Sequence, residues 1–281
     1  MAIKIITDSS SDLSPAYAAA NDIEIIPLRI VFGEESYLSG VEMTPDQFFR
    51  KLETVDELPK TSQPTPGELT EVFKKYLDAG DEVVAIFISK EMSGTYLSSC
   101  LVRDNEELEN LYIIDSQTVT FALGILVMEA VRLKGLGYSA REIYEELERA
   151  KEKVFLYASV GTLKYLQMGG RLSSTSAFFG SVLNIKPIIT IKGGLVEAID
   201  KQRGQKRAFD ALVELLKKGN VDLERPRIIA HTDHPELMDE LAEQIAHYTD
   251  FDTDAFARCD IGATVGVHVG PGACGFAFFA K

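Results

Sequence analysis

Three consecutive residues, Ser93, Gly94 and Thr95, combine two hydroxyl groups with a glycine where an apolar strand is followed by a helical stretch. The first turn of a helix offers unpaired backbone N–H groups and the positive end of the helix dipole, so an anion fits there. Hydroxyl residues at this position also serve as plain helix caps. The sequence therefore predicts either an anion site or an ordinary cap.

A second pair of hydroxyl groups, Thr61 and Ser62, lies in the segment TSQPTPGE. The two prolines restrict the backbone, and Pro66 suits the first position of a helix capped by Thr65. A stiff loop holds its side chains at a set distance from the sheet edge. That property serves a ligand site and a simple connection equally well.

Arg171 follows a pair of glycines, and His268 precedes the glycine-rich turn GPGACG. Glycines allow close backbone approach, so the Arg171 guanidinium could reach an acidic ligand, although an ordinary ion pair within the protein explains it as well. We expect His268 in a strand. A strand histidine is usually structural, but beside this turn it could also donate to an anion.

Four basic residues, Lys201, Arg203, Lys206 and Arg207, cluster in the segment KQRGQKR of an otherwise acidic chain. The simplest interpretation is a solvated helix start. The alternative is a surface that docks an acidic or phosphate-bearing partner.

The common catalytic motifs are missing or lack their context. There is no GxxxxGK[ST] loop, no GxSxG elbow and no HExxH helix. Gly270, Gly272 and Gly275 match the dinucleotide fingerprint, but the six residues that follow leave no room for its helix and second strand. His231 and His234 fit a strand end and a proline-started helix better than a metal site. We therefore predict no metal and no catalytic residues.

One enzymatic alternative rests on Asp8, at the end of the first strand. An aspartate there could accept a phosphoryl group or bind a metal, with Ser9 to Ser11 contacting phosphate. Asp12 and the serines also make a good helix cap, and no second acidic cluster or general base accompanies Asp8.

Short apolar strands alternate with helical stretches through the first 153 residues. The expected strands cover 3–8, 23–32, 81–89 and 111–116. This alternation is typical of βαβ units and predicts a mostly parallel sheet flanked by helices. The hydroxyl-rich loops would then lie at the carboxyl edge of the sheet, where open α/β sheets bind ligands.

The pattern changes from residue 154 onward. Gly193 and Gly194 separate two β-rich stretches and predict a hairpin, so the second sheet should be mixed or antiparallel. Residues 255–269 are predicted as strand. The fold class is therefore α/β, with an N-terminal α/β domain over 1–153 and a C-terminal α/β domain over 154–281.

Composition limits the function further. The formal net charge is -14, which disfavours a nucleic-acid partner because phosphate backbones need a basic face. The first residues lack the features of a signal peptide, and no apolar stretch approaches the roughly 20 residues that span a bilayer. Three widely spaced cysteines fit reduced thiols. We expect a soluble cytoplasmic protein.

Eight motifs occur in one order along the chain, and together they resemble those of the DegV family of fatty-acid-binding proteins, which includes the binding subunits of bacterial fatty acid kinases. The motifs are TDSSSDL at 7–13, TSQPTP at 61–66, SGTY at 93–96, GGRLS at 169–173, IKPI at 185–188, KQRG at 201–204, HTDHPE at 231–236 and VHVGPGACG at 267–275. Cys274 departs from the family pattern, where we expect a small aliphatic residue.

The resemblance implies a fatty acid in a cavity between the domains, with no cofactor. It assigns the carboxylate to Thr61, Ser93 and Gly94, and a polar network around the head group to Arg171 and His268. Arg203, with Lys201, would lie where a fatty acid kinase catalytic subunit docks. Such a protein presents the carboxylate for acyl-phosphate formation in phospholipid synthesis, and lipid exchange would involve peripheral membrane contact.

Overall fold

A four-stranded parallel sheet is built from the first half of the chain, in the order β2-β1-β6-β7. The computed structural model describes residues 2–174 and 184–281. The strands are β1 (Ile3–Asp8), β2 (Ile23–Ile26), β6 (Glu82–Phe87) and β7 (Leu111–Asp115). The predicted parallel sheet is confirmed.

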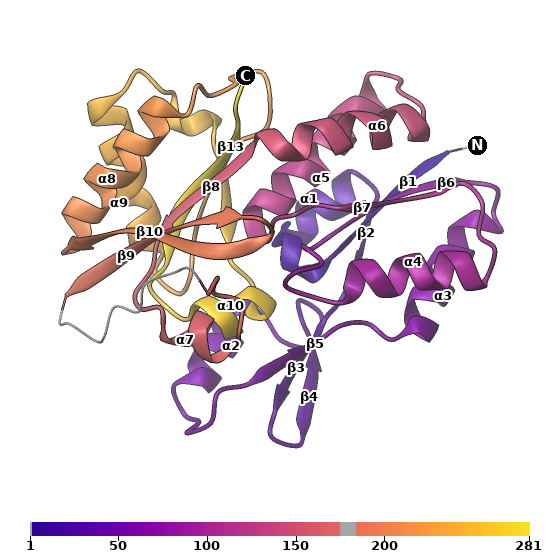
Figure 1. Cartoon of the computed structure of the whole chain (residues 1–281), viewed down its shortest axis with the longest axis horizontal. Helices are drawn as coiled ribbons and strands as arrows, with labels where there is room; N and C mark the ends of the chain where they lie inside the picture. Colours follow the sequence, from indigo (N-terminus) through magenta and orange to yellow (C-terminus); the bar gives the residue numbers. More distant parts are fainter. Residues whose placement is uncertain (1, 175–183) are drawn as a thin grey trace.

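Helices connect these strands and cover both faces of the sheet (Figure 1). They are α1 (Pro15–Ala20), α3 (Pro66–Leu77), α4 (Thr95–Asn105), α5 (Thr120–Gly135) and α6 (Ala140–Ala150). Short 3-10 turns, η1 (Ser9–Ser11) and η2 (Lys151–Lys153), follow β1 and α6. As predicted, Thr65 caps α3 and a proline occupies its first turn.

The second half forms a six-stranded mixed sheet in the order β10-β9-β8-β13-β11-β12. Its strands are β8 (Val154–Ser159), β9 (Ile185–Lys192), β10 (Leu195–Arg203), β11 (Ile228–His231), β12 (Ala257–Asp260) and β13 (Cys274–Phe279). Only the β11–β12 pair is parallel. The predicted hairpin at Gly193 and Gly194 and the mixed sheet are both confirmed.

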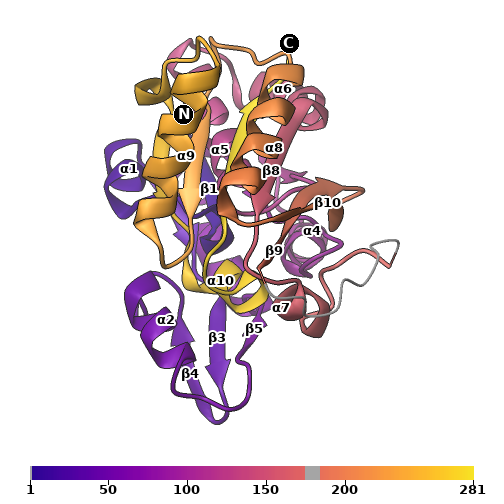
Figure 2. The ribbon, with the colours of Figure 1, turned by 90° about the vertical axis from the view of Figure 1, so that its left-hand side faces the viewer.

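Two helices, α8 (Gln205–Lys218) and α9 (Pro235–Tyr248), pack on one face of the mixed sheet (Figure 2). Its other face meets α5, which also packs against β1 and β6 of the parallel sheet. Because α5 is enclosed by both sheets, it carries buried residues on all sides, from Phe121 to Leu133. One apolar cluster therefore runs continuously through both halves.

A small antiparallel sheet, in the order β4-β3-β5, was not predicted. Its strands are β3 (Arg29–Phe32), β4 (Glu35–Leu38) and β5 (Lys60–Ser62), and α2 (Pro45–Leu52) lies beside it (Figure 2). The single strand predicted over 23–32 is wrong: Pro27 has no N–H to donate, and the chain leaves the parallel sheet there.

The strand predicted over 255–269 is also wrong beyond Asp260. After η3 (Thr253–Ala255) and β12, the chain forms helix α10 (Ala263–Val269), so His268 lies on a helix. The β-branched residues Val265 and Val267 favoured a strand. Packing overrides that preference, because Gly266 brings the helix backbone against Phe48 and Phe49 of α2.

The strands of the parallel sheet all precede residue 116, and those of the mixed sheet all follow 153. The shared core means that the division into two domains at 153 stays a prediction. Within the described residues, no helix has the length and apolarity needed to cross a membrane.

Candidate functional site

A cavity of about 300 Å3 lies among α10, the hairpin β9–β10 and the loops after β6 and β7. Its wall is mostly aliphatic and draws on both halves of the chain. The apolar lining residues are Leu28, Ile88, Met92, Val119, Phe121, Leu156, Ala158, Leu166, Ile189, Ile191, Val196, Ile261, Val265, Val269 and Ala273. A volume of this size is within the usual range for small-molecule sites.

Five residues singled out from the sequence all line this cavity: Thr61, Ser93, Gly94, Arg171 and His268. They come from four separate segments, namely β5, the start of α4, the segment after α7 (Lys164–Met168), and α10. Within the group, Thr61 Oγ1 lies 2.9 Å from His268 Nε2. The fold therefore gathers hydroxyl, guanidinium and imidazole groups that are up to 207 positions apart in sequence.

His268 is neutral at physiological pH. Burial of the ring, and then the nearby positive charge of Arg171, lowers its pKa to about 4. Its Nδ1 is buried and has no hydrogen-bond partner among the residues that the structure describes. The ring also fills the space left by Gly169, because a Cβ there would lie 2.4 Å from Nδ1.

Arg171 is held by two backbone carbonyls. Its Nε donates to Met92 O at 3.0 Å and its Nη1 donates to Gly169 O at 2.5 Å. Because Met92 belongs to the first half of the chain, the first of these hydrogen bonds joins the two halves at the cavity wall. Among the described residues, Arg171 forms no ion pair of the kind considered from sequence, and these two partners are carbonyls.

Ser93 and Gly94 lie at the predicted start of a helix, with Gly94 as the N-cap residue of α4. The Ser93 hydroxyl is 2.9 Å from the Thr95 hydroxyl and accepts from Thr95 N–H at a long 3.4 Å. Gly94 leaves room for the Gln63 amide: a Cβ would lie 1.9 Å from the amide oxygen, so Gln63 would have to move. Ser93 thus acts partly as a cap while also facing the cavity.

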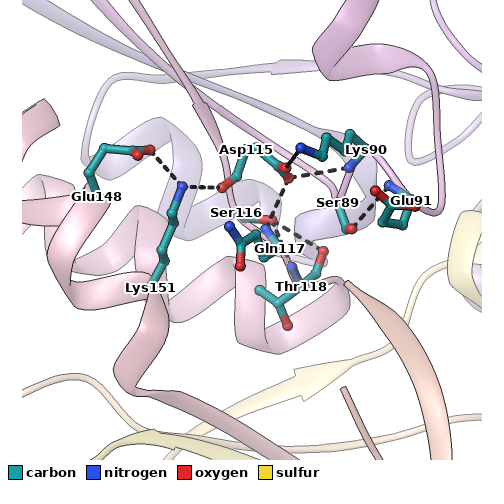
Figure 3. Close-up of polar contacts among 9 residues, drawn as sticks. All are labelled: Ser89, Lys90, Glu91, Asp115, Ser116, Gln117, Thr118, Glu148 and Lys151. Carbon is teal, nitrogen blue, oxygen red and sulfur yellow. Dashed lines mark hydrogen bonds and ion pairs between the residues drawn. The ribbon is translucent and has the colours of Figure 1, made fainter. Parts of the chain in front are cut away.

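The turn that precedes Ser93 is fixed by a polar network (Figure 3). Asp115 Oδ1, at the end of β7, accepts from Lys90 N–H at 3.2 Å and from Gln117 N–H at 3.1 Å. Ser89 N–H donates to Thr118 O at 2.9 Å. These bonds join the loops after β6 and β7, and they set the position of the turn that carries Ser93.

A second, neighbouring cleft of about 540 Å3 shares Thr61, Arg171 and His268 with the cavity. These three side chains therefore form the boundary between the two spaces. The other residues of the cleft include the loop 56–60 together with Tyr165 and Met168.

The remaining predicted groups lie elsewhere. Arg203 and Lys201 are exposed on β10 and are not among the described residues that line the cavity. Asp8 is fully buried and accepts from Ser10 N–H at 2.9 Å, Ser10 Oγ at 2.5 Å and Ile88 N–H at 2.9 Å. With both carboxylate oxygens occupied, Asp8 is poorly placed to receive a phosphoryl group.

The two histidines with metal-like spacing pair with separate carboxylates. His231 Nε2 lies 2.8 Å from Asp260 Oδ1, and His234 Nδ1 lies 2.9 Å from Glu236 Oε1. Across 2–174 and 184–281, no group of three or more potential protein ligands could hold a metal ion.

Sequence reasoning missed Gln63, which lines the cavity, and every aliphatic residue of its wall. Gln63 lies inside the TSQP motif, and its contact with Gly94 could have drawn notice to it. The aliphatic wall carries no such signal, because apolar residues in strands and helices indicate a filled core equally well.

A mostly apolar cavity that also presents hydroxyl, guanidinium and imidazole groups, inside an α/β fold, suits an amphipathic small molecule. The sequence matches the family model described as "Uncharacterised protein, DegV family" over residues 2–281. The chain belongs to the DegV family.

Individual relatives agree along the full length. A DegV domain-containing protein of Caldanaerobacter subterraneus is 34% identical over 280 residues, covering 99% of both chains. The structure of a fatty-acid-binding DegV family protein from Thermus thermophilus superposes with a TM-score of 0.90 at 29% identity, covering 100% of both chains. A stearic acid-binding protein from Eubacterium ventriosum gives a TM-score of 0.84 at 28% identity, covering 100% of this chain and 99% of that one.

Proposed function

We propose that this protein binds a long-chain fatty acid in the cavity and holds its carboxylate at the polar end. The observation that carries the proposal is the composition of the wall, which is mostly apolar but includes Thr61, Ser93, Arg171 and His268. A similar DegV family protein from Thermus thermophilus binds fatty acid, and a similar protein from Eubacterium ventriosum binds stearic acid.

The polar end suits a carboxylate. Because His268 is neutral, only one of its ring nitrogens carries a proton. When that nitrogen is Nε2, the imidazole donates to Thr61 Oγ1 and leaves the Thr61 hydroxyl proton for the ligand. Ser93 and the Gly94 backbone provide the opposite side of the head-group site, and Arg171 adds positive charge.

Burial of the tail should supply most of the binding free energy. At about 0.8 kcal/mol per buried CH2, a chain of ~15 methylenes gains ~12 kcal/mol before ordering costs. Each hydrogen bond to a charged head group adds only about 1.5 to 3 kcal/mol. The hydroxyl groups therefore set the orientation of the ligand more than its affinity.

We further propose that the protein is a non-catalytic cytoplasmic carrier. Among the described residues that line the cavity there is no carboxylate, lysine or cysteine, so the chain offers no evident nucleophile or general acid of these types there. A separate ATP-dependent fatty acid kinase would phosphorylate the presented carboxylate, as a step towards phospholipid synthesis. The exposed Arg203 and Lys201 would dock that subunit.

Exchange with lipid would involve peripheral contact with a membrane. Leu97 and Leu101 lie one turn apart on α4, just after the head-group residues, and are 52% and 62% exposed. Such exposed apolar side chains suit a transient contact with acyl chains.

The test is the lipid content of protein purified from a bacterial host. Solvent extraction and mass spectrometry should recover long-chain fatty acids from the wild type. Ile189→Trp fills the cavity and should lower the recovered amount sharply. Ile199→Trp, on the exposed side of the same hairpin, is the matched control and should retain the lipid.

Wild-type protein that carries no lipid and shows no affinity for added fatty acids would refute the proposal. Equal lipid content in the two tryptophan variants would place the ligand outside this cavity.

A further inference from the structure

The tip of the hairpin β9–β10 extends past the strand that supports it. Pairing between β8 and β9 reaches Tyr157 opposite Thr190, whereas the hairpin continues through residues 191–196. Ile191 and Val196, which face each other across the hairpin, both line the cavity. This overhanging tip is therefore a wall of the cavity that lies beyond the described pairing with β8.

The tip is linked to the segment that carries Arg171. Val196 N–H donates to Arg171 O at 3.2 Å, and Ser173 N–H donates to Val196 O at 2.8 Å. Hydrogen bonds in both directions make the two segments move as one unit. We call residues 171–173 and 191–196 together the strap.

Among the described residues, the strap contacts the first half of the chain at a short turn, residues 89–92. Gly194 lies so close that an added Cβ would be 2.5 Å from Ser89 Oγ and 3.4 Å from Glu91 Cβ. Arg171 Nε donates to Met92 O at 3.0 Å. In the described part of the chain, the strap thus meets this turn through the Arg171–Met92 hydrogen bond and the close approach of Gly194.

Several hydrogen bonds hold the turn 89–92 in place (Figure 3). Met92 N–H donates to Ser89 O at 2.9 Å and Glu91 N–H donates to Ser89 Oγ at 3.2 Å. Asp115 binds the Lys90 amide, and Lys151 Nζ in turn donates to Asp115 O at 3.1 Å. Among the described residues, few bonds join the strap to the turn 89–92, whereas several hydrogen bonds hold this turn to the first half of the chain. If the two halves separate locally, the separation would therefore occur between the strap and the turn.

We infer that the strap is the gate of the cavity: a fatty acid enters and leaves when residues 171–173 and 191–196 lift from the turn 89–92. The inference rests on the proposed function for its ligand and adds the route by which the ligand passes. Arg171 then has a second role: its hydrogen bond to Met92 O helps to hold the gate closed at the boundary between the cavity and the neighbouring cleft.

A reversible cross-link tests the gate. The distance between the Gly194 and Glu91 Cβ positions is close to the about 3.5–4.5 Å of a disulfide. Glu91→Cys with Gly194→Cys should therefore close the gate when oxidised. Cys100→Ser would be added because Cys100 is only partly buried, whereas Cys259 and Cys274 are buried.

Release of a fluorescent fatty acid should be about ten-fold slower, or more, in the oxidised protein, and reduction should restore the original rate. The two single-cysteine variants should show no such change under the same oxidation. An unchanged release rate in verified cross-linked protein that still holds the probe would overturn the inference.

A pair of glycine variants gives a second test that needs no cross-link. Gly194→Ala crowds Ser89 and should speed release about five-fold, the equivalent of losing about 1 kcal/mol of closure. Gly193→Ala is the matched control, since Gly193 also has a positive φ but has open space around it. Equal release rates for the two variants would contradict the gate.

The outcomes separate the two proposals. Wild-type protein that binds no fatty acid refutes the proposed function, and the gate with it. Protein that binds fatty acid normally, but exchanges it at the same rate with the strap cross-linked, refutes the gate alone.

Discussion

Ser93 and Thr61 both line the cavity from different segments, and neither belongs to its aliphatic wall. The double variant Ser93→Ala, Thr61→Ala should therefore keep most of its fatty-acid affinity. It should lose productive presentation, because the carboxylate is no longer oriented. Binding by fluorescence and acyl-phosphate formation with a fatty acid kinase would measure the two effects separately, and undiminished phosphorylation would contradict the assigned roles.

His268 should make the folded state sensitive to acid. Its pKa is about 4 in the folded protein, below the ordinary value of 6.5, so between these values the unfolded chain binds a proton that the folded chain does not. Its contribution to the free energy of unfolding therefore rises with pH across this window and is constant above it.

Urea unfolding of the wild type and His268→Gln at several pH values checks this sign. The difference in unfolding free energy, wild type minus variant, should increase from pH 4 to 6.5 and then level off. Parallel pH curves for the two proteins would show that His268 does not titrate as described.

At the residue scale, the sequence revealed the polar end of the site and not its wall. Hydroxyl groups near the sheet edge made Thr61 and Ser93 candidates, and the resemblance to the DegV family then assigned the carboxylate to them. Ile188 and Ile189 are both apolar and adjacent, yet Ile189 lines the cavity while Ile188 packs in the core beneath α8 and α9. No pattern in the sequence separates an empty space from a filled one.

At the scale of elements, α10 depends on the close approach of Gly266 to α2. A Cβ at Gly266 would lie 2.8 Å from Phe48 and 3.0 Å from Phe49. Gly266→Ala should destabilise the protein by about 1–2 kcal/mol, because overpacking outweighs the gain of about 1 kcal/mol in helix propensity.

Gly135→Ala, in the last turn of α5 where nothing lies within 4 Å, is the matched control and should be neutral or slightly stabilising. Denaturant unfolding measures both. Equal unfolding free energies of the two variants would mean that α10 can move away from α2 without any loss of stability.

The same helix shows why some elements escaped prediction. The strands β1, β6 and β7 are short apolar runs bounded by polar loops, so their pattern and their structure agree. In α10, local preference for a strand loses to a contact with residues more than 200 positions earlier. A preference of this kind is context-dependent, and the context is absent from the local sequence.

At the scale of the whole molecule, a buried carboxylate joins the two halves. Glu129 of α5 is 1% exposed and accepts two hydrogen bonds of 2.8 Å from Arg132. Arg225, which precedes β11, lies 3.7 Å away. Glu129→Gln should lower the unfolding free energy by about 1.5–3 kcal/mol, since a charged hydrogen-bonded group is lost from a buried place.

Glu146→Gln provides the comparison, because Glu146 pairs with Arg149 at the same spacing but on the surface. That variant should change stability by less than about 0.5 kcal/mol. Similar losses of unfolding free energy in the two variants would show that burial does not increase the stabilisation provided by the Glu129–Arg132 pair.

The enclosure of α5 by both sheets has a consequence for biosynthesis. This helix emerges from the ribosome before any strand of the mixed sheet does, so one of its apolar sides stays uncovered until the C-terminal strands emerge. The nascent chain is thus a natural client for a chaperone, and premature termination after α6 should yield an insoluble product.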